Sequence, residues 1–194
     1  LLVFKQIINS NQNKHLHKNN KTMLPKLIAT DVDGVLTNGG MYYDEHFNEL
    51  KKFNVSDGVG VIFCKLLQIP VAIFTGENTP IVSRRAKKLG IEHVFLGCKN
   101  KVQNLSQLCQ QLGIDPQQVA YIGDDINDIQ MLKTVGFSAC PANAPLYVRK
   151  YAHITLSKKG GQGVFREFVE YILQRENLLN HCIELFLTQE ANKS

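Results

Sequence analysis

The sequence predicts an α/β protein with a doubly wound parallel sheet, the Rossmann-like arrangement in which helices cover both faces of the sheet. Three observations lead to this prediction. Short apolar segments without polar interruptions are typical of strands buried on both faces. They alternate with longer segments of helical periodicity. Polar residues that could bind a ligand follow several of the apolar segments directly, as they do at the strand ends of open parallel sheets.

The elements are expected in regular alternation from residue 26 onward. Pro70, Gly90 and Gly113 stand where three of the helical patterns stop, and these residue types commonly end helices. The expected order is a strand at 27–30, a helix at 59–68, a strand at 71–74, a helix at 79–89, a strand at 93–96, a helix at 101–112, a strand at 119–122, a helix at 126–134, short strands near 137–140 and 153–156, and a helix at 163–174.

Residues 40–53 interrupt this alternation. They have the pattern of two short strands on either side of a polar turn, which is typical of a β-hairpin. The segment is too short to form a separate cap domain over a binding site. The sequence therefore predicts one folded domain at 23–174 with a small hairpin insertion and no cap domain.

The two ends of the chain differ from this domain. Residues 9–22 are polar, and residues 1–22 carry four lysines and no acid, so they hold +4 of the net charge of +5. We expect them to be a disordered basic extension, with Met23 as a candidate natural start. Residues 175–194 are expected to be a C-terminal tail that could form a helix, packed either on its own domain or on a neighbouring subunit.

Composition excludes several classes of function. Beyond residue 22 the chain is near neutral and has no basic stripe interleaved with aromatic residues, so nucleic acid is not an expected partner. No apolar run approaches the roughly 20 residues needed to span a bilayer. The cysteine count is five, and no pair forms a Cys-x-x-Cys motif. The cysteines are therefore expected to be core residues of a reducing compartment such as the cytoplasm, not disulfides or zinc ligands.

Carboxylates and a hydroxyl follow three of the predicted strands. Asp31 and Asp33 come after the first strand, Thr75 after the second, and Asp124 and Asp128 after the strand at 119–122. Because the carboxyl ends of parallel strands share one edge of the sheet, we expect these side chains to converge. Lys101, beyond the strand at 93–96, should lie near the same edge.

This set of residue types suits phosphoryl transfer. Several carboxylates close together repel one another unless a cation is present, and oxygen ligands of this kind suit Mg²⁺. One carboxylate can attack phosphorus, while a second exchanges protons with the leaving group and with water. A hydroxyl and an ammonium group can hold the phosphoryl oxygens.

Each motif alone has a simpler explanation. Asp31-Val-Asp-Gly34 could be only a turn, Gly123-Asp124-Asp125 could only cap the next helix, and Lys101 could be a solvated residue at a helix start. Their joint occurrence at successive strand ends favours the catalytic interpretation.

The four motifs together resemble those of the haloacid dehalogenase superfamily of phosphatases. The resemblance spans about 26–174 and lies in Asp31-Val-Asp-Gly-Val-Leu-Thr37, Phe74-Thr-Gly76, Lys101 and Gly123-Asp-Asp-Ile-Asn-Asp128. It implies that Asp31 is the nucleophile and Asp33 the general acid/base.

The same resemblance implies the remaining roles in the site. Thr75, Gly76 and Lys101 would bind the phosphate. Mg²⁺ would be bound by Asp31, by the backbone carbonyl of Asp33 and by Asp124. Asp125 and Asp128 would support the site, with Asp128 orienting Lys101 or the metal shell.

Within the superfamily, the chain most resembles the capless branch typified by 3-deoxy-manno-octulosonate 8-phosphate phosphatase. Further segments that carry this resemblance are 53–58, 97–101 and 160–167, which includes Arg166. It implies hydrolysis of a 3-deoxy-2-ulosonic acid phosphate through an aspartyl-phosphate. It also implies a homotetramer in which hairpins pack together and neighbouring subunits help to close each site.

One position leaves the substrate open. The chain has Thr75-Gly76-Glu77 where enzymes for the eight-carbon substrate usually have Thr-Gly-Arg. Glu77, with Arg85 and Lys88, resembles relatives that act on nine-carbon ulosonate 9-phosphates, although a glutamate also simply favours a helix N-terminus. A non-catalytic assembly module and a phosphotransferase are the alternatives from other classes of function.

Overall fold

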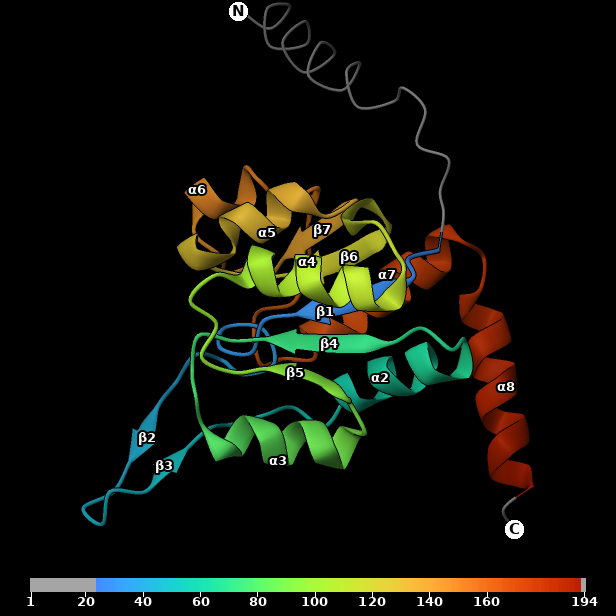
Figure 1. Cartoon of the computed structure of the whole chain (residues 1–194). Helices are drawn as coiled ribbons and strands as arrows, with labels where there is room; N and C mark the ends of the chain where they lie inside the picture. The colour runs from blue at the N-terminus through green and yellow to red at the C-terminus, as the bar shows by residue number, and fades with distance from the viewer. Residues whose placement is uncertain (1–23, 193–194) are drawn as a thin grey trace, which may run out of the picture.

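The computed structural model describes residues 24–192, and they form the predicted doubly wound α/β fold. Six parallel strands make the central sheet in the order β5-β4-β1-β6-β7-β8. Figure 1 shows helices on both faces of this sheet. The strands are β1 (Leu27–Thr30), β4 (Val71–Phe74), β5 (His93–Phe95), β6 (Val119–Ile122), β7 (Phe137–Cys140) and β8 (Ile154–Thr155).

The strands are continuously apolar because both of their faces are buried. In β1, Ile28 belongs to the hydrophobic cluster on one face of the sheet, and Leu27 and Ala29 belong to the cluster on the other face. The first cluster lies beneath α2 (Asp57–Leu66), α3 (Pro80–Leu89), α7 (Val164–Arg175) and α8 (Leu179–Ala191). The second lies beneath α4 (Lys101–Leu112), α5 (Ile129–Thr134) and α6 (Leu146–Arg149).

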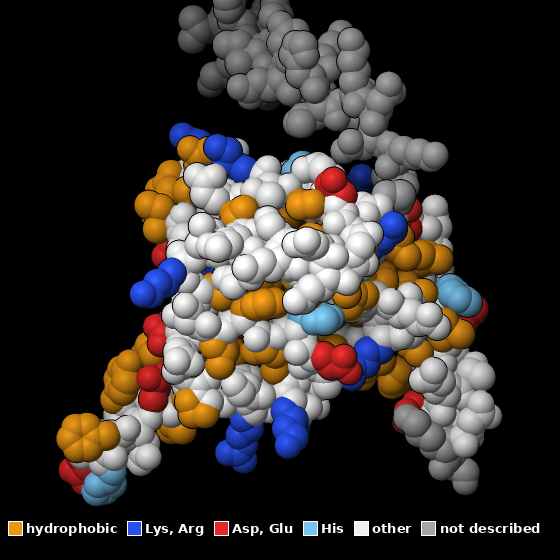
Figure 2. Space-filling model, viewed as in Figure 1, with side chains coloured by type: hydrophobic (Ala, Val, Ile, Leu, Met, Phe, Trp, Pro, Cys, Tyr) orange, Lys and Arg blue, Asp and Glu red, His pale blue; other side chains and the backbone are white. Residues whose placement is uncertain are grey.

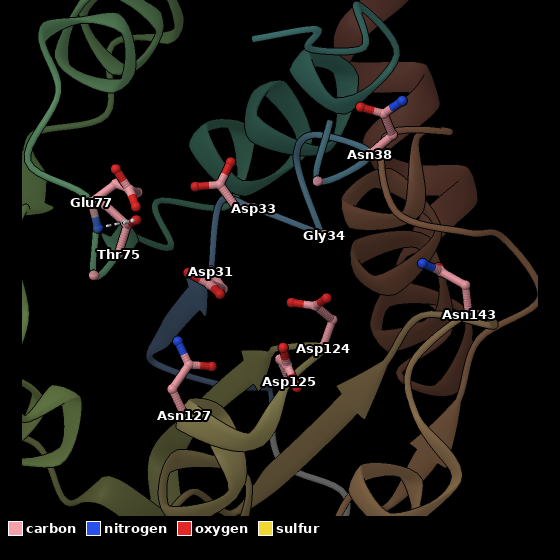
Figure 3. Close-up of a pocket in the computed structure, with 12 residues that line it drawn as sticks. Asp31, Asp33, Gly34, Asn38, Thr75, Glu77, Asp124, Asp125, Asn127 and Asn143 are labelled. Carbon is pink, nitrogen blue, oxygen red and sulfur yellow. Dashed lines mark hydrogen bonds between the residues drawn. The ribbon is translucent and has the colours of Figure 1, made fainter. Parts of the chain in front are cut away.

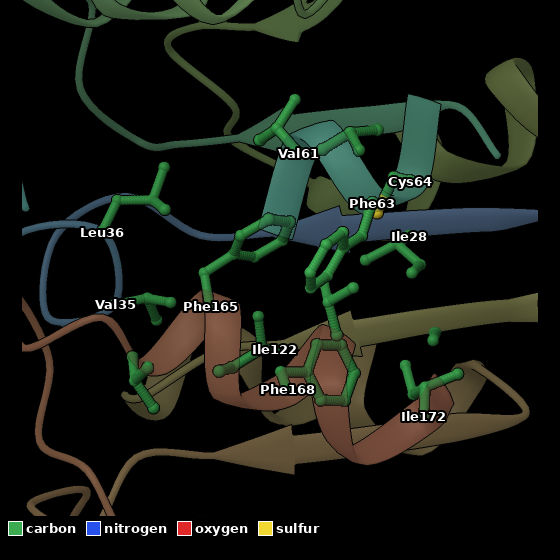
Figure 4. Close-up of a cluster of buried hydrophobic side chains, with 14 of the residues drawn as sticks. Ile28, Val35, Leu36, Val61, Phe63, Cys64, Ile122, Phe165, Phe168 and Ile172 are labelled. Atoms are coloured by element: carbon green, nitrogen blue, oxygen red, sulfur yellow. The ribbon is translucent and has the colours of Figure 1, made fainter. Parts of the chain in front are cut away.

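Aromatic side chains of α7 fill much of the first cluster. Phe165 and Phe168 are almost completely buried, and Figure 4 shows them between α7, α2 and the strands that carry Ile28 and Ile122. This packing fixes α2 and α7 against the same face of the sheet.

The hairpin also forms as predicted, with shorter strands than the segment allows. β2 (Tyr42–Tyr43) pairs antiparallel with β3 (Glu49–Leu50). In Figure 1 it projects away from the body of the domain. Its turn is closed by Asp44, whose carboxylate accepts hydrogen bonds from the backbone of His46 and Asn48.

Three short elements were not predicted. They are the 3₁₀ turns η1 (Pro116–Gln118) and η2 (Ile126–Asp128), and the single-turn helix α6. The helix predicted at 126–134 is thus η2 followed by α5, because capping by Asp125 and Asp128 tightens its first turn. Side-chain caps of this kind leave little periodic signal in the sequence.

The C-terminal segment contains a helix, α8, that packs on its own domain. Cys182 of α8 is fully buried in the first cluster, and Leu178 and Leu179 pack against it. Residues 1–22, predicted to be disordered, lie outside the described residues. All five cysteines are free thiols. Over residues 24–192 the helices are all too short or too polar to cross a membrane.

Candidate active site

A pocket of about 330 Å³ opens at the carboxyl ends of β1, β4 and β6. Figure 3 shows Asp31, Asp33 and Asp124 around one opening, with Thr75 and Glu77 on one side and Asn143 on the other. Seven of the predicted site residues line it: Asp31, Asp33, Thr75, Gly76, Glu77, Asp124 and Asp125. The other lining residues are Gly34, Asn38, Gly39, Asn127 and Asn143.

Asp31 lies at the end of the central strand and is only 5% exposed. Burial, and then the nearby Asp128 carboxylate, raise the pKa of Asp31 well above its usual value, while Lys101 acts in the opposite direction. The ammonium of Lys101 lies 3.0 Å from Asp31 Oδ1. The candidate nucleophile is therefore a desolvated carboxylate with one cation beside it.

Lys101 is placed by the start of α4. The side chain of Asn100 caps this helix by accepting from the backbone of Gln103, so Lys101 is the first helical residue and points back to the sheet edge. Burial lowers the pKa of Lys101, but Asp31 and Asp128 outweigh burial and raise it. The ammonium is therefore charged at neutral pH.

Asp128 is saturated with hydrogen bonds from protein groups. Its Oδ1 accepts from Lys101 at 2.6 Å and from the Tyr121 hydroxyl at 2.5 Å. Its Oδ2 accepts from the backbone amides of Asp124 and Asp125 at 2.9 and 3.2 Å. With both oxygens occupied, Asp128 orients Lys101 and the loop that carries Asp124, which supports its predicted supporting role.

Three carboxylates at this edge of the sheet lie close enough together to surround a divalent cation. Asp31, Asp124 and Asp128 each offer an oxygen, and these oxygens lie within 4.8 Å of one another. Asp124 Oδ1 is buried and has no hydrogen-bond partner among residues 24–192. Burial, followed by Asp128 and Asp125, raises the pKa of Asp124 to about 7.

A hard cation such as Mg²⁺ would satisfy this orphaned oxygen and relieve the repulsion between the carboxylates. Because Asp128 is saturated, Asp31 and Asp124 are the side chains left to bind it. The backbone carbonyl of Asp33 remains a predicted ligand.

The carboxylate of Asp33 is held by two donors. The Thr37 hydroxyl donates to Asp33 Oδ1 at 3.1 Å, and the Lys51 ammonium donates to Oδ2 at 2.7 Å. Lys51 directly follows the hairpin and was missed by the sequence analysis, because Lys51-Lys52 has the pattern of a solvated charged pair.

The glycine-rich segment 160–163 packs on the loop at 31–37, called the nucleophile loop here because it begins with the candidate nucleophile Asp31. Gly161 donates its amide to the Val35 carbonyl at 2.8 Å, and a Cβ on Gly160 would collide with the backbone carbonyl of Gly34. Gly34 itself has φ +81° and faces the Asp124 carboxylate so closely that a side chain would not fit. These glycines allow the motif that begins at Asp31 and the motif that contains Asp124 to approach each other closely.

Thr75 is buried and presents its side chain at the end of β4. Its hydroxyl oxygen accepts from the backbone amide of Glu77 at 3.1 Å, which shapes the short loop before α3. Glu77 is exposed at the rim of the pocket.

Lys101 reaches Asp31 but is not among the residues that line the pocket, and the three other basic residues predicted to bind substrate do not line it either. Arg85 donates to the Asn54 carbonyl at 2.8 Å and lies over the Phe53 ring. Arg166 pairs with Glu170 at 2.7 Å, and Lys88 is exposed on α3. Each guanidinium has a partner elsewhere, so a role in substrate binding for these residues stays a prediction.

Three asparagines in the pocket were also missed. Asn143 follows β7, so the strand-end rule that found Thr75 could have found it. Asn127 lies inside the Gly123–Asp128 motif, and Asn38 follows the first motif directly. The sequence gives no signal that distinguishes Asn38 from an ordinary loop residue.

Comparison with known proteins agrees with this geometry. A family model described as haloacid dehalogenase-like hydrolase matches residues 85–168. The 3-deoxy-D-manno-octulosonate 8-phosphate phosphatase of Haemophilus influenzae is 41% identical over 151 residues, which cover 78% of this chain and 84% of that protein. The Escherichia coli K12 enzyme of the same name is 38% identical over 158 residues, which cover 81% of this chain and 84% of that protein.

A solved structure shows a similar level of sequence identity to this chain. The 3-deoxy-D-manno-octulosonate 8-phosphate phosphatase of Moraxella catarrhalis, in complex with a magnesium ion, a phosphate ion and a KDO molecule, superposes with a TM-score of 0.82. It is 38% identical, and the match covers 86% of this chain and 95% of that one.

Proposed function

The chain belongs to the 3-deoxy-D-manno-octulosonate 8-phosphate phosphatase family of haloacid dehalogenase-like hydrolases, and we propose that it releases phosphate from a 3-deoxy-2-ulosonic acid phosphate. The eight-carbon 8-phosphate is the proposed substrate. The proposal rests mainly on the surroundings of Asp31. This buried carboxylate lies 3.0 Å from the Lys101 ammonium, and the nearby Asp124 has a carboxylate oxygen without a hydrogen-bond partner within the described residues.

The proposed reaction has two steps. A carboxylate oxygen of Asp31 attacks phosphorus and forms an aspartyl-phosphate, while Asp33 gives a proton to the departing sugar oxygen. Asp33 then takes a proton from the water that hydrolyses the aspartyl-phosphate. Lys101 and Thr75 hold the phosphoryl oxygens, and Asp128 keeps Lys101 in place. Mg²⁺, when bound by Asp31 and Asp124, would neutralise the carboxylates and share the charge of the phosphoryl group.

A nine-carbon ulosonate 9-phosphate is the second candidate substrate. Glu77 at the rim of the pocket favours it, because a glutamate accepts hydrogen bonds from sugar hydroxyls, whereas an arginine would bind a carboxylate.

The proposed assembly is a homotetramer joined through its hairpins, located in the cytoplasm. Tyr43, Phe47 and Leu50 on the hairpin are 68%, 99% and 65% exposed. Figure 2 shows apolar side chains at the tip of the projecting hairpin. A two-stranded hairpin is marginally stable alone, and a clustered apolar surface of this kind typically marks an interface. The five free thiols support a reducing compartment.

The test is phosphate release from the eight-carbon 8-phosphate and the nine-carbon 9-phosphate, with and without Mg²⁺. We expect Mg²⁺-dependent release from at least one of them. The substitution Asp31→Asn should lower kcat by more than about a thousandfold and leave the circular dichroism spectrum unchanged.

The matched control is Asp115→Asn, which replaces an exposed helix cap by an equally good one, and it should keep full activity. A folded wild-type protein that releases no phosphate from any sugar phosphate would favour the assembly module. Substantial turnover by Asp31→Asn would refute Asp31 as the nucleophile.

A further inference from the structure

Lys51 is a buried cation at the base of an exposed hairpin. Its side chain is 0% exposed, although Tyr43, Phe47 and Leu50 of the same hairpin are mostly in solvent. The ammonium lies 2.7 Å from Asp33 Oδ2 and 3.9 Å from Glu49 Oε1. Burying a lysine ammonium is costly unless it is paired, so this side chain is held in place by its carboxylate partners.

The partner oxygen belongs to a carboxylate that is fixed on both sides. Asp33 Oδ1 accepts from the hydroxyl of Thr37, which is completely buried and whose amide donates to the Val32 carbonyl at 3.0 Å. Asp33 itself is 28% exposed and lines the pocket. One donor therefore comes from the nucleophile loop, and the other comes from the segment that leaves the hairpin.

We infer that Lys51 is a positioning residue, which holds the Asp33 carboxyl in the orientation needed to exchange protons with the substrate and water. The inference rests on the proposed function, in which Asp33 is the general acid/base. Thr37 alone leaves the carboxyl free to rotate about its remaining bond, whereas two donors on opposite oxygens define its plane. The hairpin thereby contributes to proton transfer as well as to the molecular surface.

The leaving group distinguishes this role from a purely structural one. A sugar alkoxide leaves only with a proton from Asp33, whereas p-nitrophenolate leaves without one. The parameter kcat/KM reports steps up to the first phosphoryl transfer, so it isolates the proton donation. Replacing Lys51 by methionine keeps an apolar chain of similar length and removes only the ammonium.

We expect Lys51→Met to lower kcat/KM for the ulosonate phosphate by about 10- to 100-fold, since positioned general acids contribute about 100- to 10,000-fold. For p-nitrophenyl phosphate the change should stay within about threefold. Lys51→Arg should restore most of the loss, because it returns a cation that can donate to a carboxylate. In an Asp33→Asn background, Lys51→Met should have no further effect on the sugar phosphate.

The matched control is Lys52→Met, which removes the neighbouring exposed lysine and should leave both substrates unaffected. Circular dichroism and thermal unfolding check that each variant folds. Equal losses with both leaving groups would overturn the inference in favour of a structural role for Lys51. A rise in KM with unchanged kcat would overturn it in favour of direct substrate binding.

Failure of the proposed function gives a different result. A wild-type protein that hydrolyses other alkyl phosphates but no ulosonate phosphate would overturn only the proposed substrate, and the leaving-group comparison would then use those esters. A wild-type protein that hydrolyses no phosphate ester would overturn both.

Discussion

At the scale of single residues, Asp124 makes the stability of the folded protein depend on pH. Its pKa of about 7 in the folded protein lies well above the usual value of an aspartate, chiefly because of burial. The folded state therefore binds this proton more tightly than the unfolded chain does, and folding loses stability as pH rises from about 4 to about 7. Above about pH 7 this loss of folding stability is complete, and it is recovered only if a cation binds to Asp124 in place of the proton.

Mg²⁺ should therefore stabilise the protein more at pH 8 than at pH 6. Protons and Mg²⁺ compete for Asp124, so the affinity for Mg²⁺ should fall by up to about tenfold for each pH unit below about 7. Thermal unfolding at both pH values, with and without Mg²⁺, measures this effect.

Asp124→Asn should unfold at nearly the same temperature with and without Mg²⁺, whereas Asp115→Asn should behave as the wild type does. An equal affinity for Mg²⁺ at pH 6 and pH 8 would contradict the role assigned to Asp124.

At the scale of elements, the site depends on the contact between the 160–163 segment and the nucleophile loop. Asn143 reinforces it by accepting from the Gly160 amide at 2.8 Å. Both partners at Gly160 and Gly34 are backbone, so neither can rotate away from an added methyl group.

Gly160→Ala should therefore displace the nucleophile loop. We expect a loss of about 1–3 kcal/mol in the free energy of unfolding, the usual cost of overpacking, together with a large loss of kcat. Denaturant unfolding and phosphate release measure the two effects.

Gly58→Ala is the control, because its Cβ would meet only the flexible Leu89 side chain at 3.3 Å, and alanine favours the helix α2. If Gly160→Ala were as stable as the wild type, the prediction would be wrong, because the nucleophile loop would then accommodate the added methyl group.

The elements that the sequence predicted are those whose signals are local. Buried strands such as β1 are recognised by uninterrupted apolar residues, and α3 and α4 by periodicity that ends at Gly90 and Gly113. The strand-end rule then located Asp31, Thr75 and Asp124. Lys51 could not be found in this way, because its pairing with Asp33 depends on the path of the intervening hairpin through space.

At the scale of the whole molecule, the hairpin exposes several large apolar side chains in the single chain, among them Tyr43, Phe47 and Leu50. Its exposed aromatic residues support the proposed tetramer, and the proposed catalytic groups from Asp31 to Asp128 all belong to one chain. A dissociated chain would therefore keep all of these groups.

The double substitution Tyr43→Ser/Phe47→Ser should dissociate the proposed tetramer and leave the secondary structure intact, because both side chains point into solvent in the single chain. Light scattering coupled to size exclusion measures the mass. Leu187→Ser on α8, also exposed, should leave the mass unchanged. A wild-type protein with the mass of one chain would refute the tetramer.

The central position of β1 also constrains when the enzyme becomes active during its own synthesis. β1 pairs with β4 (Ile28 with Val71) and with β6 (Leu27 with Val119), contacts that close loops of roughly 40 and 90 residues and form slowly. Asp31 leaves the ribosome long before Asp124 does. We therefore expect a nascent chain to have no phosphatase activity until β6 has emerged and joined the sheet.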